Sequence, residues 1–167
     1  MGREIADHTI TLISASKAFN VPGLLTAFAV IPNEEIRKRY KETVFKMGFH
    51  VAGAGLVAAH TAYIGQCDEW LKAMKAYLTA NRDFLVEYVT KYMPGVKVTI
   101  PSATYLAWLD CTELNLEPSP YEFFLKQANV ALSDGAKFGK GNDQYVRLNF
   151  GTSRSYSNKG LIGCVRL

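Results

Sequence analysis

The sequence is poor in the features that would place it outside the ordinary globular proteins. It has three cysteines in 167 residues, at positions 67, 111 and 164, and none belongs to a CxxC pair. An odd count without paired spacing argues against a disulfide framework and against a zinc site, so we expect no metal. Free thiols are typical of a reducing compartment, which predicts a cytoplasmic protein.

Charge of one sign is also scarce. Nineteen Lys and Arg against fifteen Asp and Glu leave a net charge of +4, and no run of like charges reaches five residues. The densest cluster, residues 37–41, follows Glu34 and Glu35 and is typical of a solvated helix face. We therefore expect no nucleic-acid partner.

The first residues, MGREIA, contain no apolar segment of the kind found in signal peptides. The longest stretch without a charged residue, 47–67, is long enough to span a bilayer. Four glycines lower its hydrophobicity, and His50, His60 and Gln66 would each need a polar partner in lipid. We expect a small-residue helix inside a globular domain, and no membrane partner.

What the chain does have is a globular composition, with 49% hydrophobic and 20% charged residues. The spacing of its hydrophobic residues and the positions of turn-forming Gly, Pro and Asn predict the elements of its first half. These are a strand over 8–14, a turn over 14–17, a fully buried strand over 27–31, a helix beginning near Glu34 and a Gly/Ala-rich helix over 52–65.

A long amphipathic helix is expected from Asp68 to the Pro94-Gly95 pair. Its apolar stripe is expected to be core: Trp70, Met74, Tyr77, Leu78, Leu85, Tyr88 and Tyr92. After it we expect strands over 96–100 and 105–110, a helix over 119–129, a strand over 130–132, a loop over 133–144, a strand over 145–150 and a helical tail. This order predicts an α/β piece followed by an α+β subdomain.

Several local patterns suggest chemistry but do not meet its requirements. GAGLVA at 53–58 lacks the preceding strand and the later acidic residue of a dinucleotide site. GAKFGKG at 135–141 is one residue short of a P-loop and has Gly141 where Ser or Thr would bind magnesium. His8, His50 and His60 do not have metal-ligand spacing.

The tetrapeptide Ser14-Ala15-Ser16-Lys17 is different, because it places a lysine and two hydroxyls at the end of an apolar strand. One interpretation is an ordinary turn with a solvent-exposed lysine. The other is a partly desolvated Lys17 amine that acts as a nucleophile, beside hydroxyls that hold a phosphate.

Three segments together favour the second interpretation: SASKAFNVPGL at 14–24, SATYLAWLD at 102–110 and YVRLNFGTSR at 145–154. In order and spacing they resemble signatures of fold-type I pyridoxal-phosphate enzymes, and most of all the MalY/PatB-type cystathionine β-lyases. The likeness runs from about residue 4 to about residue 160. It implies an α/β fold of the fold-type I transferase class, of which this chain resembles the C-terminal part.

The resemblance assigns roles to single residues. Lys17 matches the lysine that binds pyridoxal 5'-phosphate covalently, and Ser14 matches a serine that binds the cofactor phosphate. Ser16 lies in the same motif. Arg147 matches the arginine that holds the substrate α-carboxylate, and Arg154 is the second candidate for that task.

The chain also departs from the pattern. Many aminotransferases of this class have a phosphate-binding arginine eight residues after the lysine, where this chain has Leu25. The family's cofactor-stacking aromatic and its aspartate for the pyridine nitrogen precede the lysine by long distances, and none of the sixteen residues before Lys17 fits those roles. The resemblance thus implies the end of a large cofactor domain at 1–75, a connecting helix at 76–94 and a small domain at 95–167.

The implied activity is a carbon–sulfur β-lyase that acts on a sulfur-containing amino acid as a homodimer. An aminotransferase on the same scaffold and a non-catalytic fragment remain open alternatives.

Overall fold

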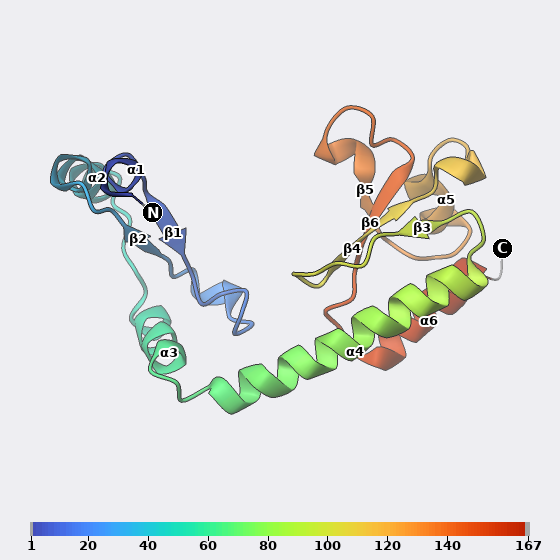
Figure 1. Cartoon of the computed structure of the whole chain (residues 1–167), viewed down its shortest axis with the longest axis horizontal. Coiled ribbons are helices and arrows are strands. Elements are labelled where there is room, and N and C mark those ends of the chain that lie inside the picture. The colour runs from blue at the N-terminus through green and yellow to red at the C-terminus, as the bar shows by residue number, and fades with distance from the viewer. Residues whose placement is uncertain (1, 166–167) are drawn as a thin grey trace. The chain divides into compact units, whose positions relative to one another are not determined.

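The computed structural model describes residues 2–165 and divides into two compact units, 1–73 and 74–167 (Figure 1). The boundary between the units falls inside one long helix, α4 (Asp68–Tyr92).

The first unit holds a two-stranded antiparallel ribbon and three helices. Its elements are α1 (Arg3–Ala6), β1 (Thr11–Ile13), a 3-10 turn at Pro22–Leu24, β2 (Phe28–Val30), α2 (Glu34–Lys46) and α3 (Gly53–Tyr63). In the ribbon Leu12 lies opposite Ala29. The expected strand over 8–14 is therefore confirmed only in its centre.

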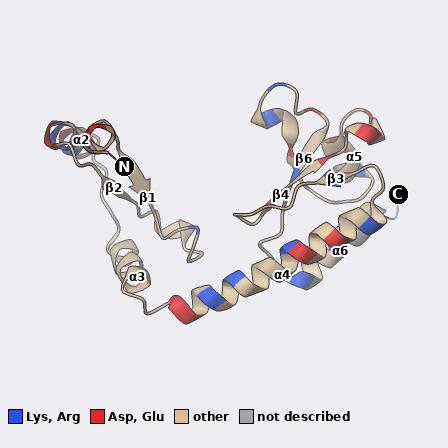
Figure 2. Cartoon of the chain, viewed as in Figure 1, with Lys and Arg blue, Asp and Glu red and all other residues tan. Residues whose placement is uncertain are grey.

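Local chemistry explains where the helices of this unit begin. The Asn33 side chain accepts a hydrogen bond from the Ile36 amide at 3.0 Å, which caps α2, and Glu34 and Glu35 occupy its first turn as expected. Helix α3 carries no charged residue (Figure 2). Its Gly55 is buried so closely against Thr26 that a Cβ there would collide with the Thr26 hydroxyl. Small residues thus permit the close approach, as predicted.

The expectation that residues 27–31 form a fully buried strand is wrong. In β2 the Phe28 and Val30 side chains are exposed, and only Ala29 is half-buried. The physical reason is that β2 pairs with β1 alone within the part of the chain that the structure describes. A continuous apolar run is typical of a strand whose sheet is covered on both faces. The strand is buried only where helices or other strands cover both faces.

The second unit is an antiparallel sheet with helices on its core face. The sheet has the order β3-β4-β6-β5, with β3 (Lys97–Val98), β4 (Leu106–Asp110), β5 (Ser133–Asp134) and β6 (Tyr145–Asn149). Helix α5 (Pro120–Lys126) is capped by Ser119, and α6 (Arg154–Val165) lies along α4 (Figure 1). The expected strands near 105–110 and 145–150 and the helical tail are confirmed.

The core of this unit joins α4 to the sheet. Ala107 and Leu109 of β4 and Val146 of β6 point into it and are almost fully buried. From α4 the buried residues are Asn81, Leu85 and Val89, which are four residues apart.

The predicted stripe of α4 is only partly confirmed. Leu85 is buried and Tyr88 packs against the core, but Trp70, Tyr77 and Tyr92 are each exposed by nearly half. The buried positions follow an i, i+4 spacing that includes Asn81, whereas the prediction considered apolar side chains alone.

The third expected strand of this half lies elsewhere. Residues 130–132 form no strand, and Ser133 and Asp134 pair with Arg147 and Val146 of β6 instead. Val130 and Leu132 pack against the core without joining the ladder. The segment expected as a loop over 133–144 thus contains β5 and a 3-10 turn, Gly135–Phe138.

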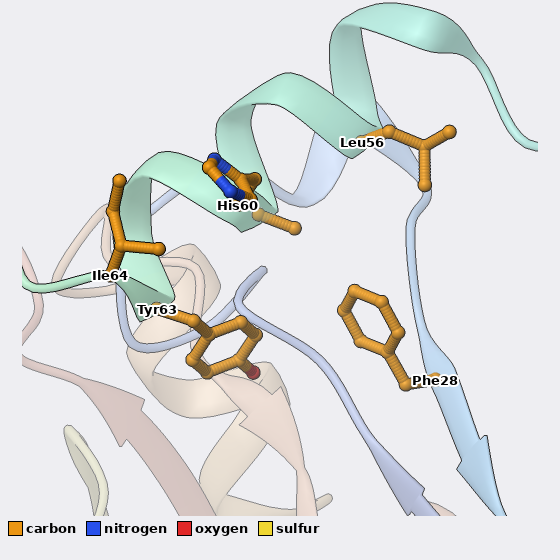
Figure 3. Close-up of a pocket in the computed structure, with 6 residues that line it drawn as sticks. Phe28, Leu56, His60, Tyr63 and Ile64 are labelled. Atoms are coloured by element: carbon orange, nitrogen blue, oxygen red, sulfur yellow. The ribbon is translucent and has the colours of Figure 1, made fainter.

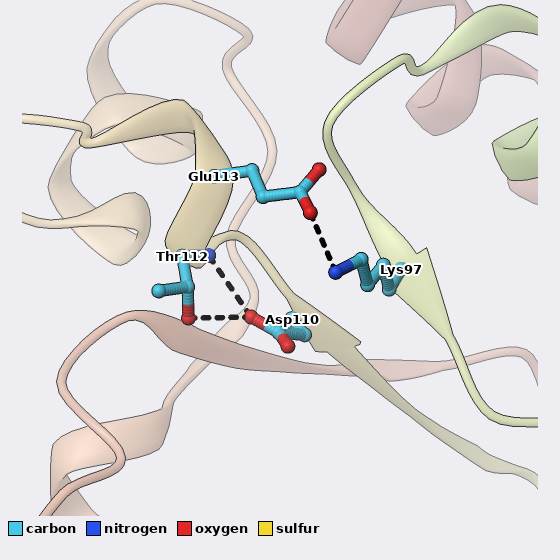
Figure 4. Close-up of polar contacts among 4 residues, drawn as sticks. All are labelled: Lys97, Asp110, Thr112 and Glu113. Atoms are coloured by element: carbon cyan, nitrogen blue, oxygen red, sulfur yellow. Dashed lines mark hydrogen bonds and ion pairs between the residues drawn. The ribbon is translucent and has the colours of Figure 1, made fainter.

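The end of β4 is fixed by a small polar cluster (Figure 4). Both the amide and the hydroxyl of Thr112 donate to Asp110 Oδ1, at 2.9 and 2.6 Å. These bonds hold the pKa of the Asp110 carboxyl below its ordinary value. Lys97 Nζ pairs with Glu113 Oε1 at 2.6 Å, which joins β3 to the following 3-10 turn, Thr112–Leu114.

The three cysteines are free thiols. Burial raises the pKa of Cys111 to about 12 and that of Cys164 to about 11, so both are small core side chains rather than nucleophiles. Within residues 2–165, no helix is both long and apolar enough to cross a bilayer.

Candidate active site

The turn that follows β1 brings the two predicted serines together. Ser14 Oγ lies 2.7 Å from Ser16 Oγ and accepts a hydrogen bond from the Ser16 amide at 3.1 Å. It donates to the Thr26 carbonyl at 2.6 Å, which ties the turn to the residues before β2. The turn closes further through the Val21 amide, which donates to the Ser16 carbonyl at 2.9 Å.

The turn packs on apolar side chains. Ala15 is buried against Ala59 and Ala62 of α3. Phe19 stacks on Trp70 with ring centroids 6.4 Å apart and meets Tyr63 edge to face. The turn is thereby held on α3 and the first turns of α4.

Lys17 itself is exposed in this unit, so the expected partial desolvation of its amine is wrong for the chain as described. Lys17 follows the buried Ala15 by two residues. A lysine that must lose water to become a nucleophile requires further cover at this point.

The residues of this turn fit a phosphate and an aldehyde chemically. The Ser16 hydroxyl can donate to a phosphate oxygen, the Ser14 hydroxyl can do so by rotating away from the Thr26 carbonyl, and a primary amine follows them directly. Leu25, the position where many aminotransferases have an arginine, is exposed by 86% and adopts a left-handed φ of 46°. It contributes no charge to this group.

Arg147 lies on the outer face of the sheet in the second unit. In β6 it pairs with Trp108 of β4 on one side and Ser133 of β5 on the other. Its Nη2 donates to Ser133 Oγ at 3.3 Å, and its guanidinium lies 4.6 Å from the centre of the Phe138 ring.

Arg154 begins α6 and is bound to α4. Its Nε donates to Asn81 Oδ1 at 2.8 Å, its amide donates to Tyr77 Oη at 2.8 Å, and its guanidinium lies over Phe84. Asn81 is 1% exposed, and its Nδ2 donates to the carbonyls of Phe150 and Thr152.

The two arginines therefore differ in their contacts. Arg154 closes a network that fixes the start of α6, whereas Arg147 rests on a ring and a single hydroxyl. Among residues 2–165, neither guanidinium has a carboxylate within ion-pair distance. The structure brings Ser14, Ser16 and Lys17 into one turn of the first unit and places both arginines in the second.

Asn81, Ser133 and Phe138 are not among the residues predicted from the sequence. Asn81 gave a usable signal, because it is a polar residue in phase with Leu85 on an amphipathic helix. Ser133 and Phe138 gave none, since their contacts with Arg147 depend on the pairing of β5 with β6.

An open apolar pocket lies in the first unit between β2 and α3 (Figure 3). Phe28, Leu56, Tyr63 and Ile64 line it, and His60 is its only imidazole. Among the described residues that line this pocket, the only other polar side chain is Tyr63 and none is a carboxylate, so His60 lacks an acidic partner for acid–base work there.

Comparison with known proteins agrees with the motifs. The family described as Aminotransferase class I and II matches residues 2–161, so the chain belongs to that family. Cystathionine beta-lyase of Corynebacterium glutamicum is 37% identical over 93% of this chain. Protein MalY of Escherichia coli is 33% identical over 92% of it, and cystathionine beta-lyase PatB of Bacillus subtilis 30% identical over 95%. An aspartate aminotransferase of Pyrococcus horikoshii is 27% identical.

Solved structures have the same fold. The C-S lyase of Staphylococcus hominis, bound to pyridoxal phosphate, is 32% identical, covers 96% of this chain and superposes with a TM-score of 0.85. Cystalysin of Treponema denticola, which contains pyridoxal 5'-phosphate, is 26% identical, covers 99% and gives 0.91. The chain thus has the predicted α/β fold of fold-type I enzymes. It spans only about 40% of the length of these relatives.

Proposed function

We propose that this chain is the C-terminal part of a pyridoxal-phosphate-dependent carbon–sulfur β-lyase. The observation that carries the proposal is the Ser14-Ala15-Ser16-Lys17 turn, which offers an amine and two hydroxyls. Relatives that are 37% and 30% identical to this chain are named cystathionine beta-lyases, which supports the assignment. The substrate class is cystathionine or another cysteine S-conjugate, which with one water gives a thiol, pyruvate and ammonia.

In this proposal Lys17 Nζ anchors the cofactor aldehyde, and the Ser14 and Ser16 hydroxyls bind its phosphate. The cofactor, when bound, supplies an electron sink for charge that develops at the substrate Cα. Lys17 Nζ, once free, would take the Cα proton, and the electron pair left at Cα would expel the sulfur from Cβ as a thiolate, which takes up a proton to leave as the thiol. Arg147 holds the α-carboxylate through a planar pair of N–H donors, with Arg154 as the second candidate.

The complete protein is proposed to be a cytoplasmic homodimer. Residues 1–75 would end its large cofactor domain, 76–94 would form the connecting helix and 95–167 the small domain. The free thiols of Cys67, Cys111 and Cys164 support a reducing compartment.

An aminotransferase on the same scaffold is the second candidate, and the aminotransferase relatives favour it. The two reactions differ in their need for a co-substrate. A lyase releases pyruvate from cystathionine without a keto-acid acceptor, whereas a transaminase needs that acceptor for turnover.

The test of the proposal is chemical trapping on the complete protein. Borohydride reduction in the presence of pyridoxal phosphate, followed by peptide mapping, should place a single adduct on Lys17. Lys17→Ala should abolish the adduct and turnover together. An adduct on Lys137 or Lys140 in place of Lys17 would show that the site is misassigned.

A further inference from the structure

A short segment, Asp134 to Asn142, folds back beside Arg147 and is closed more tightly than its Gly- and Lys-rich sequence suggests. Asp134 Oδ1 accepts from the Ala136 amide at 3.1 Å. Asn142 Nδ2 lies within bonding distance of the Phe138 and Gly139 carbonyls, at 3.4 and 3.3 Å. We call these residues, 134–142, the support loop.

Gly135 shows how closely this loop is packed. A Cβ at this position would collide with the carbonyl oxygens of Asn142 and Tyr145, which are backbone atoms that cannot rotate aside. Only glycine permits this approach. The loop is therefore fixed against the start of β6, two residues before Arg147.

The support loop brings the Phe138 ring to two partners that are cross-strand neighbours of each other. The Arg147 guanidinium lies 4.6 Å from the ring centre. The Trp108 ring meets the Phe138 ring edge to face with centroids 5.5 Å apart, and Trp108 in turn stacks on Tyr145. Phe138 is 46% exposed, so its contacts with these two residues account for its position better than burial in the core does.

We propose that Phe138 is a positioning residue for Arg147, and that the support loop holds the guanidinium ready for the carboxylate of an amino acid. This inference rests on the proposed function, which assigns carboxylate binding to Arg147. A cation–π contact uses none of the five N–H donors of the guanidinium. The bond to Ser133 uses one of them, on Nη2, so other N–H donors remain for a carboxylate. A side chain already held in one orientation loses less conformational entropy when the ligand arrives.

The test is an NMR titration of the full 167-residue chain labelled with ¹⁵N in arginine. Arg147→Lys identifies the Arg147 Nε–Hε signal. The Phe138 ring should shift this signal upfield, and acetate, added against chloride at constant ionic strength, should move it further. In Phe138→Leu the ring shift should vanish and acetate should bind about 2- to 5-fold more weakly, the range expected for an exposed cation–π contact.

Two matched variants separate positioning from general packing. Phe138→Tyr keeps a ring and should restore both the shift and the acetate midpoint. Tyr156→Leu removes an exposed ring elsewhere in the same unit and should change neither.

The outcomes distinguish the two proposals. Equal acetate midpoints in the unaltered chain and in Phe138→Leu would overturn the role of Phe138 and leave that of Arg147 intact. If acetate fails to move the Arg147 signal in the unaltered chain, carboxylate binding by Arg147 is wrong, and the ring shift alone then decides whether Phe138 holds the side chain.

Discussion

At the scale of single residues, the two candidate arginines are separated by their neighbours. Arg154 completes the hydrogen bonding of a fully buried asparagine, whereas Arg147 lies on the open face of the sheet with its N–H edge unpaired by any carboxylate in residues 2–165. Removing the Arg147 side chain should therefore weaken substrate binding, whereas removing the Arg154 side chain should destabilise the fold.

We expect Arg147→Ala in the complete enzyme to reduce kcat/KM by about 10- to 150-fold, because a charge-assisted contact with a carboxylate contributes roughly 1.5–3 kcal/mol. Cofactor binding and thermal stability should stay close to those of the parent. Steady-state kinetics, cofactor absorbance and thermal unfolding measure these three quantities.

Arg154→Ala is the paired variant, and it should lower stability through the loss of its bond to Asn81 and its contact with Phe84. A larger kinetic loss in Arg154→Ala, with Arg147→Ala near neutral, would transfer the carboxylate-binding role to Arg154.

Asp110 gives a prediction about pH. Its two bonds from Thr112 lower the pKa of the carboxyl from 3.8, so the ionised form is favoured in the folded state. The stabilisation is therefore complete above that ordinary value and is lost as the pH falls through the lowered one.

Urea unfolding should find Asp110→Ala less stable than the parent by about 1 kcal/mol at neutral pH. The gap should close in acid. Asp143→Ala, at an exposed carboxylate, is the control and should show no such gap. A difference that stays constant down to pH values below the ordinary pKa would mean that the Thr112 bonds do not act through the charge.

At the scale of elements, α4 and the segment after β6 depend on one polar core residue. Asn81 is bonded to Phe150, Thr152 and Arg154, all about seventy residues away in the sequence. Leucine at this position has the same branching of side-chain heavy atoms but leaves the buried Phe150 carbonyl and the part-buried Thr152 carbonyl without this donor.

We expect Asn81→Leu to reduce the free energy of unfolding by roughly 2–4 kcal/mol, which is large for a single substitution. Thr79→Leu, on the exposed side of the same helix, should change it by less than about 0.5 kcal/mol. Chemical denaturation monitored by circular dichroism compares the three chains. Near-equal stabilities would show that water replaces the Asn81 amide.

The same scale shows what could be predicted from the sequence. Helix α2 follows from Asn33 and its acidic first turn, and α5 from Ser119 and Pro120, because caps act locally. Strand β5 could not be predicted, since polar Ser133 and Asp134 pair only because β6 offers an edge. The apolar residues before them, Val130 and Leu132, pack against the core instead.

The candidate site divides in the same way. The Ser14-to-Lys17 turn is local in sequence, so its motif could be recognised and its geometry follows. The surroundings of Arg147 come from β4, β5 and the support loop, which no short motif contains.

At the scale of the whole molecule, the first unit exposes large apolar side chains on β1, β2 and α3. Leu12 is 67% exposed and Val57 68%, and the pocket between β2 and α3 adds Leu56, Tyr63 and Ile64 (Figure 3). Patches of this kind mark surfaces that are covered by other protein. The chain spans about 40% of its relatives, which agrees with a surface built to be covered by the remainder of such an enzyme.

The 167-residue chain alone should therefore be catalytically inactive and should self-associate. The apolar faces of β1 and β2 and the unpaired edges of their ribbon favour contact between copies, and the exposed Lys17 lacks the cover that would make its amine a nucleophile. Light scattering after size-exclusion chromatography should give a mass above 18.5 kDa. With added pyridoxal phosphate, cystathionine should yield no pyruvate.

Replacing Leu12 and Val57 with lysine should reduce association without restoring activity, because charge blocks the contact but supplies no missing catalytic group. A monodisperse monomer that turns over within about tenfold of a complete relative would prove this wrong, since tenfold in rate corresponds to only about 1.4 kcal/mol of the barrier. In that case the residues present here would suffice for the chemistry.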